Sequence, residues 1–415
     1  MSIAGNRLVE SGLFQSWKDP VSGVESFLLE TRVAPFRQSF YFVNPGMSAD
    51  GRFCWFYCAF PPAGSAGLGR SLAVADLVNG TVHHFPETMF SDASPMVDPL
   101  SGEVYWCSGL EVWKRSPFPD TKPSLAGRFP EKLARNRGPQ KLATHLTFSA
   151  DRRALNLDAA FYSEWFIGHI PLDGGEFVLW EKFDRAMDHA QFSPVDPDVQ
   201  LIAEDFWVEP RTGEIRYIRN RMWLIRRGGL AMPIFPEPQA SVVPNVRGPN
   251  PHLVNDTASV VTDERSMHGH EWWSADGRHV CFVHYHRGVF RVDVSSLPPL
   301  PPGSPLPPFP APERLWASDT VSHAHMSADG RWLVADCVPG AHTGIWHVVF
   351  VNLETGREAE IVSHSEYPPE SLRRYHVHPH PQFCAQDRYV CYTTFVRGQV
   401  DVALCDVEQL VALTS

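Results

Sequence analysis

Histidine is the residue type whose positions in this chain most clearly suggest chemistry. Of the nineteen histidines in 415 residues, several precede a recurring turn motif: His189, His268, His270, His323, His325, His376, His378 and His380. A neutral imidazole binds transition metals, and one whose pKa is close to the working pH serves as a general base. The pattern predicts that these histidines converge on one site. Their spacing is not of the HExxH kind, so it does not identify a metal.

A repeated turn indicates which elements bring the histidines together. Seven copies of a Ser-Ala-Asp-Gly-Arg type of turn precede strand-like apolar runs, with the best copies at 47–52, 273–278 and 326–331. Asp-Gly supplies the positive φ that a tight turn between antiparallel strands requires. The roughly 50-residue spacing, with one wider interval, is typical of propeller blades. The sequence therefore predicts an all-β, seven-bladed β-propeller, in which equivalent positions of the blades meet at one mouth of the channel.

The rest of the chain fits a single propeller domain over residues 1–415. Apolar runs at 72–77, 348–353 and 402–407 are expected to be the third strands of blades, and no long helical period is evident. The wide interval predicts an insertion around residues 228–261. A proline-rich tract at 298–312 is expected to be a stiff connector between two blades, with an SH3-type ligand as the alternative.

Composition excludes several classes of protein. The net charge is −11, and no basic run is present, which argues against a nucleic-acid partner. No apolar run reaches the length of a membrane span, and the N-terminus lacks an apolar signal segment, so we expect a cytoplasmic protein without a membrane partner. The eight cysteines show no CxxC spacing and are expected to be buried, reduced thiols.

Four segments resemble a known family. They are Gly269–Gly277 (GHEWWSADG), Ser322–Gly330 (SHAHMSADG), His378–Phe383 (HPHPQF) and Asn220–Ile225 (NRMWLI). These are similar to the THEFW-x-x-DG, SHLMS-x-x-DG, HPHPSF and ARMWFI segments of the oligogalacturonate lyases, which are cytosolic pectin-degrading propellers. The resemblance spans nearly the whole chain and is more specific in its second half.

The resemblance implies β-elimination on a uronate. A base removes the C5 proton, and the 4-O-glycosidic bond breaks to leave a 4,5-unsaturated sugar. By position, His270 matches the base and Arg221 matches an arginine that faces the substrate carboxylate. The alternatives are a His270 that packs between Trp272 and the channel wall, and an Arg221 that pairs with a neighbouring acid. The implied cofactor is a divalent metal, with manganese favoured.

The implied metal site departs from the family pattern. His323 and His378 match metal-binding histidines, but Tyr375 stands where the family has a glutamine, and no histidine follows His380. We expect His323, His378, Tyr375 and His380 to be the ligands. His325 or His376 could complete the set instead, and a site that has lost its metal is the other interpretation.

The expected substrate is a short, acidic uronate oligosaccharide, which His189, Arg37 and Trp272 are expected to contact. The main alternative to a lyase is a non-catalytic propeller that binds a sugar or a protein partner. A hydrolase would need paired carboxylates, whereas the adjacent Glu204 and Asp205 are expected to point to opposite faces of a strand. The oligomeric state stays open.

Overall fold

The structure, a computed structural model, describes most of the chain. The described residues are 8–63, 65, 68–209, 211–216, 218, 220–234, 268–297, 299–301, 304–338, 345–366, 372 and 375–415. They form seven sheets of four or five strands, the blades of a seven-bladed β-propeller, and this confirms the predicted fold class. The chain divides into two compact units. The first comprises Met1–Arg128, Ser322–Pro339 and Thr343–Ser415, and the second comprises Phe129–Val321 and Gly340–His342.

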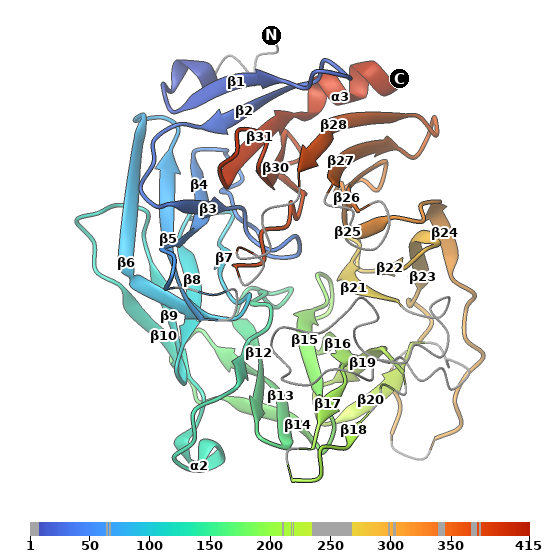
Figure 1. Ribbon diagram of the computed structural model, residues 1–415. Coiled ribbons are helices and arrows are strands. Elements are labelled where there is room, and N and C mark those ends of the chain that lie inside the picture. Colours follow the sequence, from blue (N-terminus) through green and yellow to red (C-terminus); the bar gives the residue numbers. More distant parts are fainter. Residues whose placement is uncertain are drawn as a thin grey trace. The chain divides into compact units, whose positions relative to one another are not determined.

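Three blades of the first unit are four-stranded sheets built from consecutive strands (Figure 1). One consists of β3 (Phe36–Gln38), β4 (Phe53–Ala59), β5 (Leu68–Asp76) and β6 (Thr81–Ser91). Another consists of β7 (Met96–Val97), β8 (Val104–Ser108), β9 (Glu111–Arg115) and β10 (Ser124–Arg128). A further one consists of β25 (Val321–Met326), β26 (Trp332–Cys337), β27 (Ile345–Asn352) and β28 (Glu358–Glu366).

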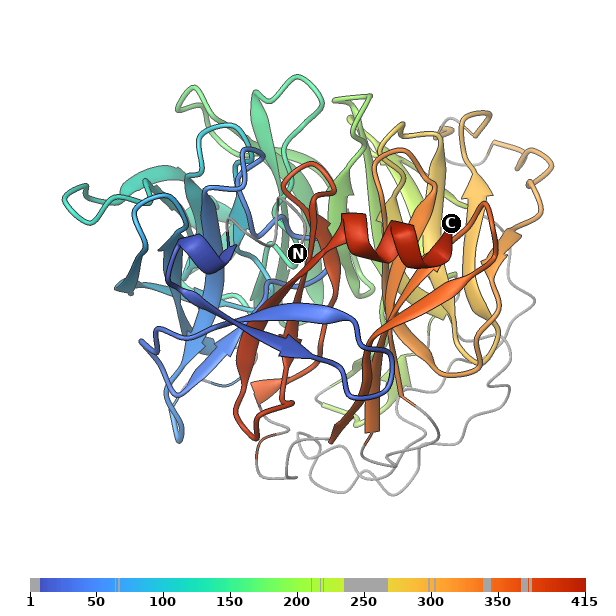
Figure 2. The same cartoon turned by 90° about the horizontal axis from the view of Figure 1, so that it is seen from above.

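The fourth blade of the first unit joins the two ends of the chain (Figure 1). Its strands are β29 (Gln382–Cys384), β30 (Tyr389–Thr394), β31 (Asp401–Asp406), β2 (Glu25–Leu29) and β1 (Phe14–Lys18). Strand β2 pairs with β31 through the register Phe27↔Leu404. Helix α3 (Val407–Thr414) continues from β31, is capped by the Asp406 side chain, and packs on β27 and β28 (Figure 2). Main-chain hydrogen bonds between N- and C-terminal strands thus complete this blade.

The second unit contains three blades and two small additions. One blade consists of β11 (Lys141–Leu142), β12 (Ala154–Phe161), β13 (Glu164–Pro171) and β14 (Val178–Phe183). The next consists of β15 (Met187–Phe192), β16 (Val199–Glu204), β19 (Met222–Arg226) and β20 (Leu230–Pro233). The last consists of β21 (His268–Trp273), β22 (His279–His284), β23 (Gly288–Asp293) and β24 (Glu313–Trp316). The additions are helix α2 (Glu131–Ala134) and the hairpin of β17 (Trp207–Val208) and β18 (Ile215–Arg216).

The repeated turns join the first and second strands of blades, as the sequence predicts. In the turn between β21 and β22, Ser274 Oγ donates to Asp276 Oδ1 (2.5 Å), which also accepts from the backbone N–H of Arg278 (3.0 Å). Gly277 has φ +65°. The three predicted third strands correspond to β5, β27 and β31. The turns therefore place the histidines that precede them on the first strands β15, β21 and β25.

Two predictions about connecting segments have different outcomes. The proline-rich tract does not lie between blades, because it joins β23 to β24, which are neighbours in one sheet. The prediction was wrong because a connection of this length is typical of a link between two blades, whereas here it links two adjacent strands of one blade. The predicted insertion around 228–261 begins with β20, which pairs with β19, and its remainder from 235 lies outside the described residues.

All eight cysteines are buried free thiols, as predicted. Within the described ranges, every helix is too short or too polar to cross a bilayer.

Candidate functional site

Four histidines of the first unit form a cluster. His323 lies on β25, and His376, His378 and His380 lie in the segment before β29. One ring nitrogen from each lies within 4.8 Å of the others. The ring centroids are 4.3 Å apart for His323 and His380, and 4.1 Å apart for His376 and His378. The geometry thus offers up to four imidazole ligands to one ion.

The backbone before β29 is bent so that its three rings converge. His376 and His380 have φ values of +49° and +43°. Such left-handed conformations are uncommon outside glycine and cost about 1–3 kcal/mol each when the surroundings impose them. Backbone strain of this kind concentrates at functional sites, so its presence at two members of the cluster supports a role in binding.

Asp336 on β26 holds His323 in place. His323 Nδ1 lies 3.1 Å from both carboxylate oxygens of Asp336, which also accepts from the backbone N–H groups of His323 (2.8 Å) and His380 (3.1 Å). Metal-binding histidines commonly pair their second nitrogen with a carboxylate in this way. The contact directs Nε2 of His323 away from Asp336, and Nε2 is the nitrogen that remains to bind an ion.

Burial keeps the cluster in the form that binds metals. It lowers the pKa of His323 and of His376 to about 3, so both rings are neutral at pH 7. Burial also raises the pKa of Asp336 to about 7. A nearby cation would favour the carboxylate form of Asp336.

The cluster fits a divalent transition metal. Nε2 of His376 is buried and has no hydrogen-bond partner among the described residues. A buried nitrogen left in this state is costly, and a bound ion would satisfy it. Imidazole ligands suit manganese, iron, zinc and copper better than magnesium or calcium.

Tyr375 is a buried residue, with 2% exposure. Its ring packs edge-on against Phe36, with centroids 5.0 Å apart, in an apolar cluster with Val377 and Val400. The neighbouring His376, which the sequence left open as an alternative ligand, contributes the fourth ring nitrogen of the cluster. It has a left-handed backbone, with φ +49°.

We expect Asp336→Asn to weaken metal binding by about 10–100-fold, the usual effect of losing an outer-shell partner. The amide retains one acceptor for the backbone N–H groups but removes the carboxylate that orients His323. Titration of the metal-free protein with Mn²⁺ and with Zn²⁺ measures this effect. Unchanged affinity for both ions in a folded variant would contradict the role assigned to Asp336.

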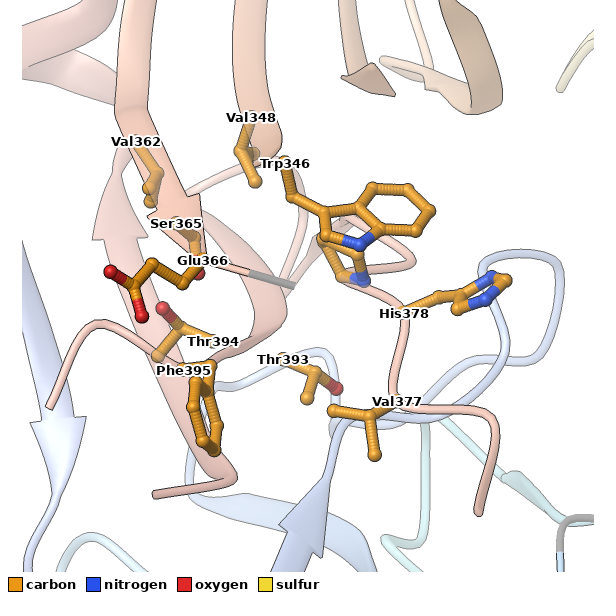
Figure 3. Close-up of a pocket in the computed structure, with 11 residues that line it drawn as sticks. Trp346, Val348, Val362, Ser365, Glu366, Val377, His378, Thr393, Thr394 and Phe395 are labelled. Carbon is orange, nitrogen blue, oxygen red and sulfur yellow. The ribbon is translucent and has the colours of Figure 1, made fainter. Parts of the chain in front are cut away.

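A cavity borders the cluster at His378. It is small, with a volume of about 20 Å³, and Figure 3 shows Trp346 and His378 on one side with Val362 and Phe395 on the other. The ring centroids of Trp346 and His378 are 4.8 Å apart.

In the second unit, His270 is oriented by a tyrosine. It lies at a β-bulge of β21, with φ +52°, and its Nδ1 is 3.1 Å from the hydroxyl of Tyr285. Bulges redirect side chains and are frequent beside active sites. The tyrosine contact fixes the orientation of the imidazole ring, as a general base requires.

Arg221 is paired with an acid. Its Nη2 and Nε lie 3.0 and 3.3 Å from the carboxylate of Glu271, and Nη1 donates to the carbonyl of Glu204 (3.2 Å). Burial opposes its charge, but Glu271 and Asp205 outweigh burial and raise its pKa. This is the paired arginine that the sequence left open as the alternative. A Cβ at Gly269 would lie 3.8 Å from Arg221 Nε, so the guanidinium lies against the backbone beside His270.

His189 is paired with its neighbour in the sequence. It lies at a bulge of β15, with φ +54°, and its Nδ1 is 2.5 Å from Asp188 Oδ1. Burial disfavours charge on His189, but Asp188 outweighs burial and raises the pKa of the imidazole. Asp188, His189 and Asp205 could in principle hold an ion. Lys141, 2.7 Å from Asp188, and Arg221, 3.7 Å from Asp205, already supply positive charge there.

The structure brings some predicted residues together and separates others. His323, His378 and His380 share the first-unit cluster, and His189, His270 and Arg221 share the polar network of the second unit. Trp272 is only 4% exposed, so it has little surface to offer a sugar. Sequence reasoning missed Asp188, Asp336 and Tyr285, although the Asp-His pair at 188–189 was a visible signal.

Arg37 is an interior residue. It is 0% exposed, and Nη2 bonds Asp401 Oδ1 (2.5 Å) and the carbonyl of Leu29 (2.6 Å). Its guanidinium therefore faces other parts of the protein and not solvent. This placement does not support the predicted contact between Arg37 and substrate.

Arg37→Leu is expected to destabilise the protein by about 3 kcal/mol, the lower end of the range for breaking a buried ion pair. The lower end applies because Asp401 keeps Arg32 and Arg397 as partners. Arg32→Leu, at a partly exposed position, should cost no more than about 1 kcal/mol. Urea unfolding of both variants tests the difference, and equal losses would contradict it.

Comparison with known proteins reveals similarity of structure. No protein-family profile matches the chain, and no curated protein matches its sequence. An oligogalacturonate lyase in complex with manganese aligns with a TM-score of 0.69 at 16% identity, over 95% of this chain and 96% of the other. An oligogalacturonate lyase from Vibrio parahaemolyticus gives 0.68 at 15% identity over the same shares. The β-propeller domain of Myceliophteria thermophila Cps50 gives 0.50 at 11% identity, over 89% and 97%. Over nearly its whole length, this chain shares the β-propeller fold of the oligogalacturonate lyases.

Proposed function

We propose that the protein is a carbon–oxygen lyase that cleaves short uronate oligosaccharides by β-elimination, with galacturonate as the first substrate to test. One observation carries the proposal. Four ring nitrogens, from His323, His376, His378 and His380, lie within 4.8 Å of one another, on a fold shared with a lyase that was solved with manganese. The buried Nε2 of His376 has no hydrogen-bond partner among the described residues, and a bound cation would satisfy it. A cation is also what an acidic sugar needs.

The chemistry assigns His270 the first step. The C5 proton of a uronate is weakly acidic, and its removal moves charge onto the adjacent carboxylate as an enediolate forms. His270, oriented through Nδ1 by Tyr285, takes that proton on Nε2. A divalent cation, if held by the histidine cluster of the first unit, would supply positive charge that favours binding of an acidic sugar. Arg221 acts by positioning, since its contact with Glu271 fixes the residue that follows His270.

The pairing of Arg221 also favours a second candidate function. A guanidinium occupied by Glu271 has fewer donors left for a substrate carboxylate. If Arg221 does not contact the substrate carboxylate, the protein would be a propeller that binds an acidic sugar and does not cleave it. The two functions differ in whether a product forms.

The proposal is tested by mixing the protein with digalacturonate and with other uronate disaccharides, and following the ultraviolet absorbance of the unsaturated product. Each substrate is tested after chelation and again with Mn²⁺ restored. We expect a metal-dependent rise on at least one substrate. Binding by calorimetry without any rise would favour the non-catalytic propeller, and neither binding nor product would overturn both.

A further inference from the structure

The second unit contains a carboxylate–imidazole pair that the proposed elimination has not yet used. His189 Nδ1 lies 2.5 Å from Asp188 Oδ1, and Asp188 Oδ2 accepts from Lys141 Nζ (2.7 Å). Asp188 is 3% exposed, while the His189 side chain retains 19% exposure. The carboxylate is therefore fixed in the interior, and the imidazole it holds still reaches solvent.

The groups around His189 favour its protonated form. Asp188 supplies the largest opposing charge, and Glu271 adds to it. The ring of His145, whose own pKa burial lowers, lies 5.1 Å from that of His189. The titratable and charged groups of the described residues that face His189 include Lys141, His145, Asp158, Asp188, Asp205, Arg221 and Glu271.

His189 and His270 occupy equivalent positions on neighbouring first strands. Both lie at β-bulges, with φ of +54° and +52°. The strands are joined by Gln191 Nε2, which donates to the carbonyl of Glu271 (2.9 Å), and by Trp273 Nε1, which donates to the carbonyl of Gln191 (3.2 Å). Two imidazoles therefore share one polar region, and each is oriented by a different partner.

The two partners suit opposite tasks. A carboxylate stabilises an imidazolium and so maintains a proton donor, whereas the neutral hydroxyl of Tyr285 adds no charge beside His270. Environments that differ in this way shift the pKa values of two groups apart, so that one group serves as the acid and the other as the base. β-Elimination needs both, because one proton leaves C5 and another must reach the departing oxygen.

We propose that His189, oriented by Asp188, is the general acid that protonates the leaving oxygen. This inference rests on the proposed lyase function. The electron pair of the C5–H bond forms the C4=C5 double bond, the C4–O bond breaks, and the oxygen takes the proton from Nε2 of His189. His189 is left neutral and regains a proton from water. His270 returns the C5 proton to solvent, so atoms and electrons balance.

A substrate that needs no acid provides the test. Wild type and His189→Asn are compared on digalacturonate and on a galacturonate that carries 4-nitrophenoxide at C4, a leaving group stable without protonation. Asparagine tolerates the positive φ of position 189. We expect kcat on digalacturonate to fall about 10²–10⁴-fold, with KM little changed. On the nitrophenyl substrate we expect a loss of less than tenfold, which also shows that the variant is folded.

The outcomes separate the acid role from the lyase function. Equal losses on both substrates would overturn the acid role and leave the lyase function intact. An inactive wild type on both substrates would overturn the lyase function itself, and the acid role with it. Asp188→Asn adds a second readout. Because Asp188 favours the imidazolium, its removal should move the alkaline limb of the kcat profile on digalacturonate to lower pH, and an unmoved limb would count against the pair.

Discussion

His270→Asn is expected to lower kcat for β-elimination by about 10²–10⁴-fold, the contribution of a positioned general base. Asparagine adopts the left-handed backbone of position 270 without added strain and cannot accept the C5 proton. The rate of unsaturated product formation at saturating substrate measures the effect. Because the substitution removes proton transfer and not binding, KM should change little.

The second unit offers a matched control for this variant. His286 is exposed and also has a positive φ, of +62°, so His286→Asn makes the same chemical change on the same kind of backbone. It should retain wild-type kcat. If the two variants lose activity equally, or if His270→Asn keeps it, His270 is not the base.

His376→Gly is expected to lower the affinity for Mn²⁺ and Zn²⁺ by about 10–100-fold or more. Loss of a direct ligand should cost at least as much as loss of an outer-shell partner, which costs about 10–100-fold. Glycine relieves the positive φ of position 376, so the backbone is not strained by the change. The variant removes the buried Nε2 that would face the ion. Calorimetric titration and metal analysis after dialysis measure the effect without any substrate.

Two further variants identify the fourth ligand. Tyr375→Phe removes the phenol oxygen but keeps the ring against Phe36, and we expect it to bind metal normally. His364→Ala changes an exposed histidine of β28 in the same unit and should also bind normally. Weak binding by Tyr375→Phe together with normal binding by His376→Gly would restore Tyr375 as the ligand and contradict the all-histidine cluster.

The blades could be predicted from the sequence because their signals are local. Asp-Gly at 276–277 and 329–330 determines a tight turn wherever it occurs between apolar strands, and each copy joins two paired strands. The histidines that precede these turns therefore lie on the first strand of a blade. His323 and His270 could therefore be assigned to blades from the amino-acid sequence alone.

The remaining site residues could not be predicted because their roles depend on non-local contacts. No local sequence pattern identifies Asp401 as the partner of Arg37. Arg221, just before β19, pairs with Glu271 on β21, fifty residues later in the chain. The sequence left His325 and His376 open as candidates, and the choice of His376 depends on a left-handed backbone that spacing does not show. Likewise, the proline-rich tract at 298–312 resembles a blade boundary until the pairing of β23 with β24 is known.

Elimination leaves a mass signature that hydrolysis cannot produce, and mass spectrometry of the products from digalacturonate therefore tests the central claim most directly. The account predicts a 4,5-unsaturated uronate and a galacturonate whose masses sum to that of the substrate, with formation lost in His270→Asn. Two saturated galacturonates, together heavier than the substrate by one water, would show hydrolysis and contradict the account.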